Sequence, residues 1–130
     1  MIYGIGTDIV GITRMEEGLA RFGEKFARRI LTDEEFAGFL LAERSAHFLA
    51  RRFAVKEAVV KALGTGFRDG ISMQHITLEH DALGKPLLNF SGRLQELMLE
   101  RGVGEGFVSV SDEREYAIAY VILCRPQPLK

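Results

Sequence analysis

Two carboxylates in apolar surroundings are the side chains of this sequence best suited to chemistry. Asp8 interrupts a run rich in Ile and Val, where a lone carboxylate is expensive to remove from water. It needs a cation, a metal ion or backbone amides as a partner, and an aspartate in a bulge that bonds to nearby amides is the simpler interpretation. On an expected helix, Glu57 shares one side with Phe53, Val60 and Lys61. Its simpler interpretation is an exposed pair with Lys61, four residues away.

Positive charge surrounds Glu57 in the sequence. The segment from Arg44 to Lys61 has one acidic residue and a local charge of +4, because it contains five basic residues: Arg44, Arg51, Arg52, Lys56 and Lys61. Such an excess beside an embedded carboxylate suits a polyphosphate that is held by cations and bridged to the acid by a metal ion. A basic helix face that is merely solvated is the alternative.

A second basic surface is expected on the first helix. Arg14, Arg21, Lys25 and Arg28 are spaced by seven, four and three residues, which places them on one stripe of a helix. Such a stripe suits an acidic protein, nucleic acid or an anionic membrane. The acidic residues on the same helix and the net charge of −1 for the whole chain argue against the last two partners.

Composition narrows the class of protein. The chain has 130 residues, 47% of them hydrophobic, which suits one domain over residues 1–130 with a real core. The single cysteine, Cys124, cannot form an internal disulfide, and the three histidines have no ligand spacing on one element. The first residues lack the layout of a signal peptide, and no apolar run approaches the length of a membrane span. A cytoplasmic protein is therefore expected.

The N-terminal segment must position Asp8. Residues 2–12 have the composition of a strand, in which glycines mark a bulge or a close approach of the backbone to another element; these are Gly4, Gly6 and Gly11. Thr13 and Glu16 have the spacing of a capping box, in which each side chain satisfies a free amide of the first helical turn. They predict a helix that ends near Arg29.

The remaining elements complete an α+β domain of helices on a mainly antiparallel sheet. Thr32 and Glu35 repeat the capping-box spacing and predict a second, shorter helix. Ser45 is a candidate N-cap for a long third helix that ends at Gly64, which can adopt the left-handed conformation. The second half is expected to contain strands over 74–80, 87–90, 107–111 and 116–123, and one helix over 92–101 that Ser91 caps.

Four motifs occur in a recognisable order along the chain. They read GIGTDIV at 4–10, RFAVKEA at 52–58 continuing to KALGTG at 61–66, GKP at 84–86 and VSVSDE at 108–113. In order and spacing they resemble the motifs of the bacterial holo-acyl-carrier-protein synthases, which are 4′-phosphopantetheinyl transferases. The match covers nearly the whole chain, and the motif on the long helix is its most specific part.

The resemblance implies a reaction, a metal ion and the fold of the 4′-phosphopantetheinyl transferases. The phosphopantetheine arm of coenzyme A would move to a serine of apo-acyl carrier protein, and adenosine 3′,5′-bisphosphate would leave. Asp8 and Glu57 would hold one Mg²⁺ and would form the catalytic group together with Lys61. The positions implied to bind coenzyme A are Arg44, Arg52, Lys61, Gly64 and Pro86.

The resemblance also implies partners. The carrier protein would dock on the first helix at Arg14, Arg21 and Arg28, and neither nucleic acid nor a membrane is expected. Family members are commonly trimers with active sites at subunit interfaces, so a homotrimer is expected. Phe107 and Asp112 depart from the family, in which histidine is common at both positions, and this leaves the nucleotide contacts near that hairpin open.

Two other functions stay open. A metal-dependent hydrolase of phosphate anhydrides would release nucleotide or phosphopantetheine without any carrier protein. A non-catalytic module whose basic helix binds an acidic protein would need neither Asp8, Glu57 nor Mg²⁺.

Overall fold

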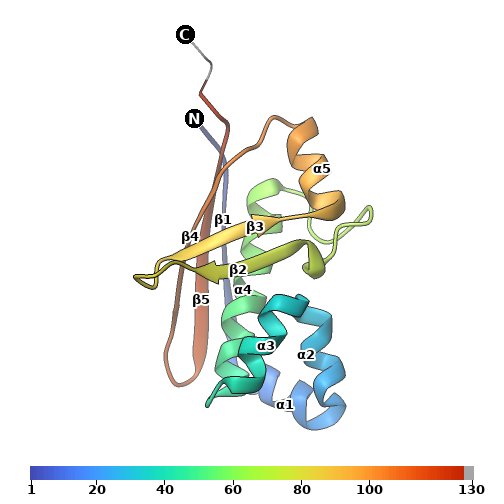
Figure 1. Cartoon of the computed structure of the whole chain (residues 1–130), viewed down its shortest axis with the longest axis vertical. Helices are drawn as coiled ribbons and strands as arrows, with labels where there is room; N and C mark the ends of the chain where they lie inside the picture. Colours follow the sequence, from blue (N-terminus) through green and yellow to red (C-terminus); the bar gives the residue numbers. More distant parts are fainter. Residues whose placement is uncertain (128–130) are drawn as a thin grey trace.

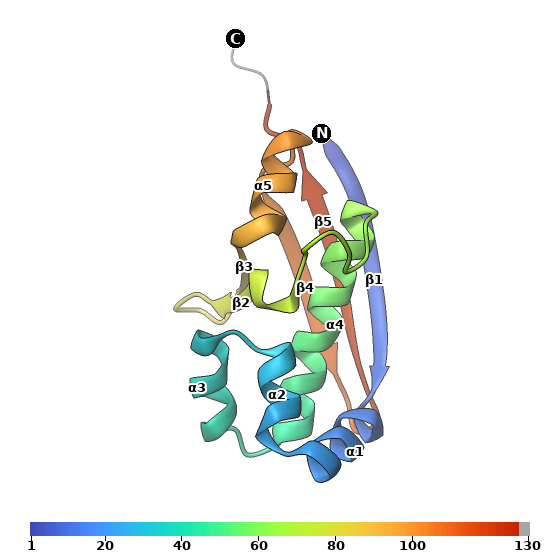
Figure 2. The ribbon, with the colours of Figure 1, turned by 90° about the vertical axis from the view of Figure 1, so that its right-hand side faces the viewer.

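Helix α4 (Ser45–Leu63) is the element around which the rest of the chain packs (Figure 1). The computed structural model describes residues 1–127 and places α4 between a three-stranded sheet and a layer of short helices (Figure 2). The helix is apolar on nearly every side, and Leu49, Val55 and Val59 are fully buried. A helix that is apolar all round belongs inside a protein, so α4 forms the centre of the core.

The three-stranded sheet consists of β1 (Ile2–Gly11), β4 (Gly106–Asp112) and β5 (Tyr116–Cys124). Its order is β1-β5-β4, and both pairings are antiparallel. Alternation along β5 turns small and apolar side chains toward α4: Ala117, Ala119, Val121 and Leu123. Figure 2 shows the helices gathered on this one side of the sheet. The expected α+β class with a mainly antiparallel sheet is confirmed.

Strand β1 lies directly against the backbone of α4. A Cβ atom built on Gly4 would collide with the carbonyl oxygen of Ala62, and one built on Gly6 would collide with that of Ala58. The expectation of a close approach of backbone is therefore confirmed for Gly4 and Gly6 and is wrong for Gly11, where a Cβ would meet nothing within 4 Å. Because side chains alternate along a strand, Asp8 follows Gly4 and Gly6 on the same face and is brought onto α4.

Three short helices cover the N-terminal half of α4; they are α1 (Ile12–Phe22), α2 (Glu24–Ile30) and α3 (Asp33–Leu41). The expectation of one continuous helix from Thr13 to Arg29 is wrong. Gly23 separates α1 from α2 with φ of 61° and ψ of −143°, a conformation open mainly to glycine. The basic stripe expected on that helix is therefore divided between two helices.

The ends of the helices agree with the sequence in part. The prediction of a capping box at Thr13 and Glu16 is wrong, because α1 begins one residue earlier, at Ile12. The amide of Ile12 donates instead to the carbonyl of Glu115 in the β4–β5 turn (2.8 Å). The capping box of α3 and the left-handed end of α4 are confirmed, at Thr32 with Glu35 and at Gly64. The cap expected at Ser45 is wrong, because Ser45 is already helical, whereas Ser91 occupies the N-cap position of α5 as expected but its side chain makes no capping hydrogen bond.

The second half of the chain closes the other end of α4. It adds a single 3₁₀ turn, η1 (Met73–His75), the hairpin of β2 (Ile76–His80) and β3 (Pro86–Phe90), and helix α5 (Gly92–Glu100). The expected strand over 74–80 is thus shorter at its start. No helix formed by residues 1–127 combines the length and the apolar character that crossing a bilayer requires.

A buried ion pair ties α3 to α4. Lys56 is fully buried, and its Nζ donates to Glu35 Oε1 (2.6 Å) and to the carbonyls of Met73 (3.0 Å) and Ile30. Oε2 of Glu35 accepts from the amide of Leu78 on β2 (3.0 Å). Burial lowers the pKa of Lys56, and the charge of Glu35 opposes this shift. One carboxylate therefore joins α3, α4 and the hairpin.

The contact between β1 and α4 predicts the effect of a single methyl group. Gly6→Ala should lower the free energy of unfolding by about 1–3 kcal/mol, because the added Cβ must force the strand away from the helix backbone. Gly11→Ala is the matched control, since a Cβ at Gly11 meets nothing within 4 Å. Urea unfolding measures both variants, and equal stabilities would contradict the close contact.

Candidate active site

Asp8 on β1 and Lys61 on α4 form the centre of the site. Lys61 Nζ lies 2.9 Å from Asp8 Oδ1 and donates to the carbonyl of Thr7 at 3.1 Å. The Asp8 side chain is 15% exposed and that of Lys61 is 52% exposed, so the pair sits at the surface edge of the β1–α4 contact. Within residues 1–127 no backbone amide donates to Asp8, and the bulge interpretation of this residue is wrong.

Glu57 lies one helical turn before Lys61 and close to Asp8. Burial and the charge of Asp8 raise the pKa of Glu57, while Lys61 and Arg14 oppose the shift. Among the described residues the ion pair of Lys61 is with Asp8 rather than with Glu57. The exposed i,i+4 pair is therefore not what holds Glu57 in place, and the ammonium of Lys61 pairs with Asp8 while its charge also acts on Glu57.

This donor set fits a small divalent cation. Mg²⁺ is commonly held by one or two protein carboxylates, with water and substrate phosphates as its other ligands. Asp8 and Glu57 supply two such carboxylates, and the ammonium of Lys61 already occupies a cation position beside Asp8. Residues 1–127 place no group of three or more acidic, His or Cys side chains that could hold a metal ion unaided. The two carboxylates would therefore need ligands from a substrate or water.

The arginines expected to dock a carrier protein lie on two helices. Arg14 on α1 lies over the ring of Phe53, 4.8 Å from its centroid. Its positive charge opposes the rise in the pKa of Glu57, so Arg14 lies near the acidic pair. Arg21 also belongs to α1. Arg28 belongs to α2, and its guanidinium stacks 3.8 Å above Phe36 of α3. Only the first two therefore share a helix next to the site.

The positive charge expected around Glu57 is distributed differently from the prediction. Lys56 is buried in the core with Glu35, and Arg51 pairs with Asp112 of β4 at 3.1 Å. Arg52 is 7% exposed and lies over the ring of Phe48. Successive side chains on a helix point about 100° apart, which is how neighbours in sequence come to face different elements. The local excess of positive charge in this segment is therefore divided among several elements, and Lys56 belongs to the core.

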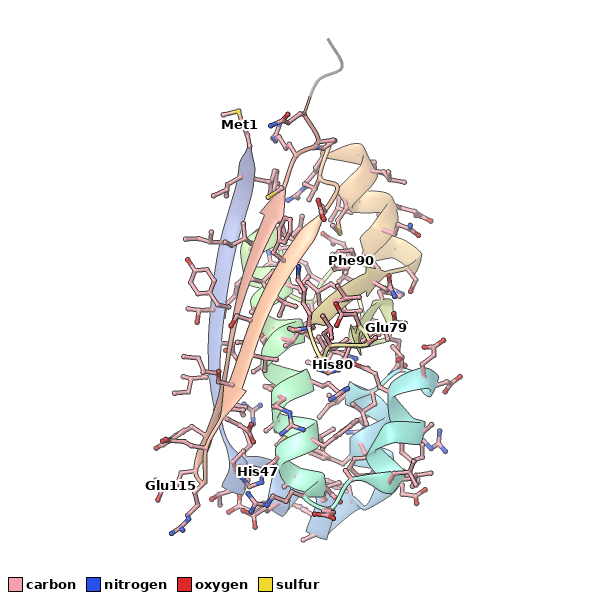
Figure 3. The ribbon with its side chains drawn as sticks, turned by 60° about the vertical axis from the view of Figure 1, so that its left-hand side comes forward. Met1, His47, Glu79, His80, Phe90 and Glu115 are labelled. Atoms are coloured by element: carbon pink, nitrogen blue, oxygen red, sulfur yellow. The ribbon has the colours of Figure 1, made fainter. Side chains whose placement is uncertain are left out.

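The residues expected to bind coenzyme A are not gathered in one pocket of a single chain. Arg44 is the exposed N-cap of α4 and Gly64 is its C-cap, about 30 Å apart along a helix of this length. Pro86 pairs with His80 in the β2–β3 hairpin. In Figure 3 the labelled residues Glu79 and His80 of this hairpin lie beside α4. Arg52 and His80 line a common cavity of about 220 Å³. The hairpin and Arg52 thus form a second group, apart from Asp8, Glu57 and Lys61.

Glu35 is a residue whose tertiary contacts were not expected from the sequence. Its capping role was visible in the Thr32–Glu35 spacing, but its pairing with Lys56 was not. The available signal was Lys56 itself, a lysine among the apolar residues of α4 that turn toward the core. A lysine in such a place requires an acidic partner or carbonyl acceptors from another element.

The outer face of the sheet is an exposed apolar surface. It carries six large apolar side chains with exposed fractions between 44% and 61%: Ile5, Ile9, Phe107, Tyr116, Ile118 and Tyr120. In Figure 3 the side chains on this face project away from α4. Phe107, one of the two departures from the family pattern, belongs to this surface. An apolar patch of this kind on a soluble domain is typical of an interface between proteins.

Comparisons with known proteins agree with this architecture over nearly the whole chain. Residues 4–121 match the family model described as the 4′-phosphopantetheinyl transferase superfamily. A holo-[acyl-carrier-protein] synthase of Halorhodospira halophila is 53% identical over 123 residues, which cover 95% of this chain and 98% of that protein. The crystal structure of the synthase from Neisseria meningitidis superposes with a TM-score of 0.91 at 44% identity, covering 96% of this chain and all of that chain.

A third relative has a nucleotide bound. The synthase of Bacillus anthracis, solved in complex with CoA (3′,5′-ADP), superposes with a TM-score of 0.81 at 36% identity and covers 97% of this chain and 99% of its own. The family model, the sequence relatives and the solved structures all match the same family. The chain therefore belongs to the 4′-phosphopantetheinyl transferase superfamily, among the holo-[acyl-carrier-protein] synthases.

Proposed function

We propose that this protein transfers the 4′-phosphopantetheine group of coenzyme A to a serine of apo-acyl carrier protein in the cytoplasm, with Mg²⁺ as cofactor and adenosine 3′,5′-bisphosphate as the second product. The observation that carries the proposal is the pairing of Asp8 on β1 with Lys61 on α4, near enough to Glu57 for the charge of Asp8 to raise the pKa of Glu57. The names of the relatives and the bound CoA (3′,5′-ADP) of one of them support the substrates.

The side chains of the site have separate roles. Asp8 and Glu57 would hold Mg²⁺, which when bound offsets the charge of the pyrophosphate. Lys61 leaves Asp8 and contacts a phosphate oxygen as a compact point charge. The serine hydroxyl attacks the phosphorus that carries pantetheine, and the bond from that phosphorus to the bridging oxygen breaks. The serine proton passes to a water molecule near Asp8 and Glu57, whose carboxylates orient it.

The nucleotide occupies the second group of residues. Arg52, in its cavity beside His80, receives the 3′-phosphate, and Pro86 at the start of β3 contacts the same end of coenzyme A. Arg44 at the start of α4 adds positive charge there, and Gly64 borders the opposite end of the helix. Because these positions are spread along α4, a neighbouring subunit completes the enclosure of the nucleotide.

The outer face of the sheet supports the homotrimer that the family resemblance implies. Its six exposed apolar side chains form a surface that is costly to leave in water. Ile9 on this face is the direct neighbour of Asp8 in β1, so a subunit that covers the sheet also approaches the acidic pair. The interface and the active site are thus continuous.

Transfer itself is tested by the intact mass of apo-carrier protein after incubation with coenzyme A, Mg²⁺ and this protein. The expected result is a mass gain of one phosphopantetheine group. A phosphate-anhydride hydrolase would instead consume coenzyme A with no change in the mass of the carrier. A non-catalytic module would leave both unchanged.

The acidic pair predicts a matched effect on activity and on stability. Asp8→Asn and Glu57→Gln should each lower kcat/KM by about 100-fold or more, since charge stabilisation of this kind is worth that much. Because the folded-state pKa of Glu57 is raised, ionised Glu57 destabilises the fold. Glu57→Gln should therefore be more stable than wild type at neutral pH, and the difference should vanish below about pH 4, the usual range of a free glutamate.

Thermal unfolding with and without Mg²⁺ checks the assignment of the metal. At neutral pH, Mg²⁺ should raise the Tm of the wild type and leave that of Glu57→Gln unchanged. Near-normal turnover in either variant would rule out the two carboxylates as the metal site.

The trimer predicts that one charge on the sheet face separates the subunits. Ile118→Asp should give a monomer by light scattering and lose most activity, because an unpaired carboxylate cannot be buried in an apolar interface. Leu99→Asp is the matched control, since Leu99 is 72% exposed on α5, away from that face. A fully active wild-type monomer at micromolar concentration would disprove the assembly.

Docking of the carrier protein on α1 predicts a salt-dependent loss of affinity in Arg21→Glu. Charge reversal should weaken carrier binding about tenfold or more by like-charge contact, while the affinity for coenzyme A stays the same. Arg21 is a cleaner probe than Arg14, because Arg14 also acts on Glu57. Arg93→Glu on α5, at the far end of the molecule (Figure 2), is the control. Calorimetry that finds equal carrier affinity in Arg21→Glu and wild type would contradict docking of the carrier protein on α1.

A further inference from the structure

Glu35 contacts more groups than its capping role requires. Its Oε1 accepts hydrogen bonds from the amide of Thr32 (2.9 Å) and from Lys56 Nζ (2.6 Å). Its Oε2 accepts from the amide of Leu78 (3.0 Å) and lies 3.4 Å from Arg52 Nε. The Glu35 side chain is 1% exposed, so these contacts are made away from water. A single carboxylate therefore faces two buried cations.

The cluster carries one positive charge in excess. Lys56 and Arg52 are two cations against the one carboxylate of Glu35, and burial lowers the pKa of each while Glu35 opposes the shift. The ammonium of Lys56 is the closer partner, at 2.6 Å against 3.4 Å for Arg52. Because an unpaired buried charge is costly, the excess favours an anion near Arg52.

The guanidinium of Arg52 is held on two sides. Its central carbon lies 3.8 Å above the ring of Phe48, one helical turn earlier, and its Nε edge faces Glu35. The Nε atom is buried without a well-formed hydrogen bond. Within residues 1–127 no hydrogen bond is made by its terminal amino groups. These groups are left available to a ligand.

The cavity beside Arg52 is large enough for an anion. Its volume is about 220 Å³, and Arg52, Phe48, Thr77 and His80 line it. A water molecule takes about 30 Å³ in the liquid, so a phosphate group with several waters fits. Glu34 and Glu79 also line this cavity but are exposed to solvent, where their repulsion of an anion is screened.

We propose that Glu35 is a positioning residue for the nucleotide, because it holds the guanidinium of Arg52 on the Phe48 ring with its terminal amino groups free for a phosphate monoester. An arginine side chain has many rotamers, and an arginine fixed in advance loses less conformational entropy on binding. Lys56 takes up the charge of Glu35, so that Arg52 is oriented without being neutralised. This inference rests on the proposed function, in which Arg52 receives the 3′-phosphate of coenzyme A.

The test compares coenzyme A with 3′-dephospho-coenzyme A, by calorimetry and by transfer kinetics. In Glu35→Gln the preference for coenzyme A over the dephospho form, measured as the ratio of their kcat/KM values, should fall about tenfold. The fall should come from a higher KM for coenzyme A, with kcat unchanged. Binding of the dephospho form should stay as in wild type. Thr32→Ala is the matched control: it breaks the capping box of α3 and lowers Tm, yet it should keep the full preference.

A second variant decides the outcome if Glu35→Gln does not fold. Phe48→Leu removes the ring under the guanidinium and leaves the Glu35–Lys56 pair in place, and it should lower the same preference. A folded Glu35→Gln or a folded Phe48→Leu with the wild-type preference would overturn the proposal. Absence of transfer by the wild type would instead refute the proposed function, while the binding preference would still report on Arg52.

Discussion

The direct contact between β1 and the backbone of α4 is the constraint on which the site depends. Aspartate and glutamate are short side chains, so Asp8 and Glu57 can meet only where strand and helix lie closer than ordinary side chains allow. Gly4 and Gly6 permit that distance by placing no Cβ atoms between the two backbones. The mutual repulsion of the two acids is the cost of this arrangement, and the ammonium of Lys61 offsets it.

Charge on α4 is divided between two faces with different roles. Lys56 and Glu57 are adjacent in sequence, yet Lys56 points into the core toward Glu35 while Glu57 points toward β1 and Asp8. Lys56 therefore ties α4 to α3 and η1, whereas Glu57 remains accessible at the surface. A central helix with few solvent-exposed positions can carry this many cations because each of four has an acidic partner from another element: Arg51, Arg52, Lys56 and Lys61.

Local patterns in the sequence predicted much of the fold. The capping box of Thr32 and Glu35, the left-handed end at Gly64 and the close approach at Gly4 and Gly6 each depend on a few adjacent residues, and the structure confirms them. The break at Gly23 was missed because a glycine inside an amphipathic pattern is compatible with a continuous helix.

Those local patterns did not predict contacts between segments that are distant in the sequence. The pairing of Glu35 with Lys56 joins residues 21 positions apart, and no periodicity encodes it. For the site, the family resemblance implied that Asp8 and Glu57 act together, whereas the side of α4 that each cation occupies depends on tertiary packing. The assigned roles in metal and coenzyme A binding stay predictions.

The glycine contact also restricts how this sequence can change over evolutionary time. Positions 4 and 6 on β1 are restricted together, because a side chain at either would collide with the backbone of α4 at Ala62 or Ala58. Neither can change alone, whereas the neighbouring strand positions that face outward are free of this restriction. Substitutions that are harmless for a strand in isolation are thus unavailable here, and Asp8 stays within reach of α4 only while two residues beside it have no side chain at all.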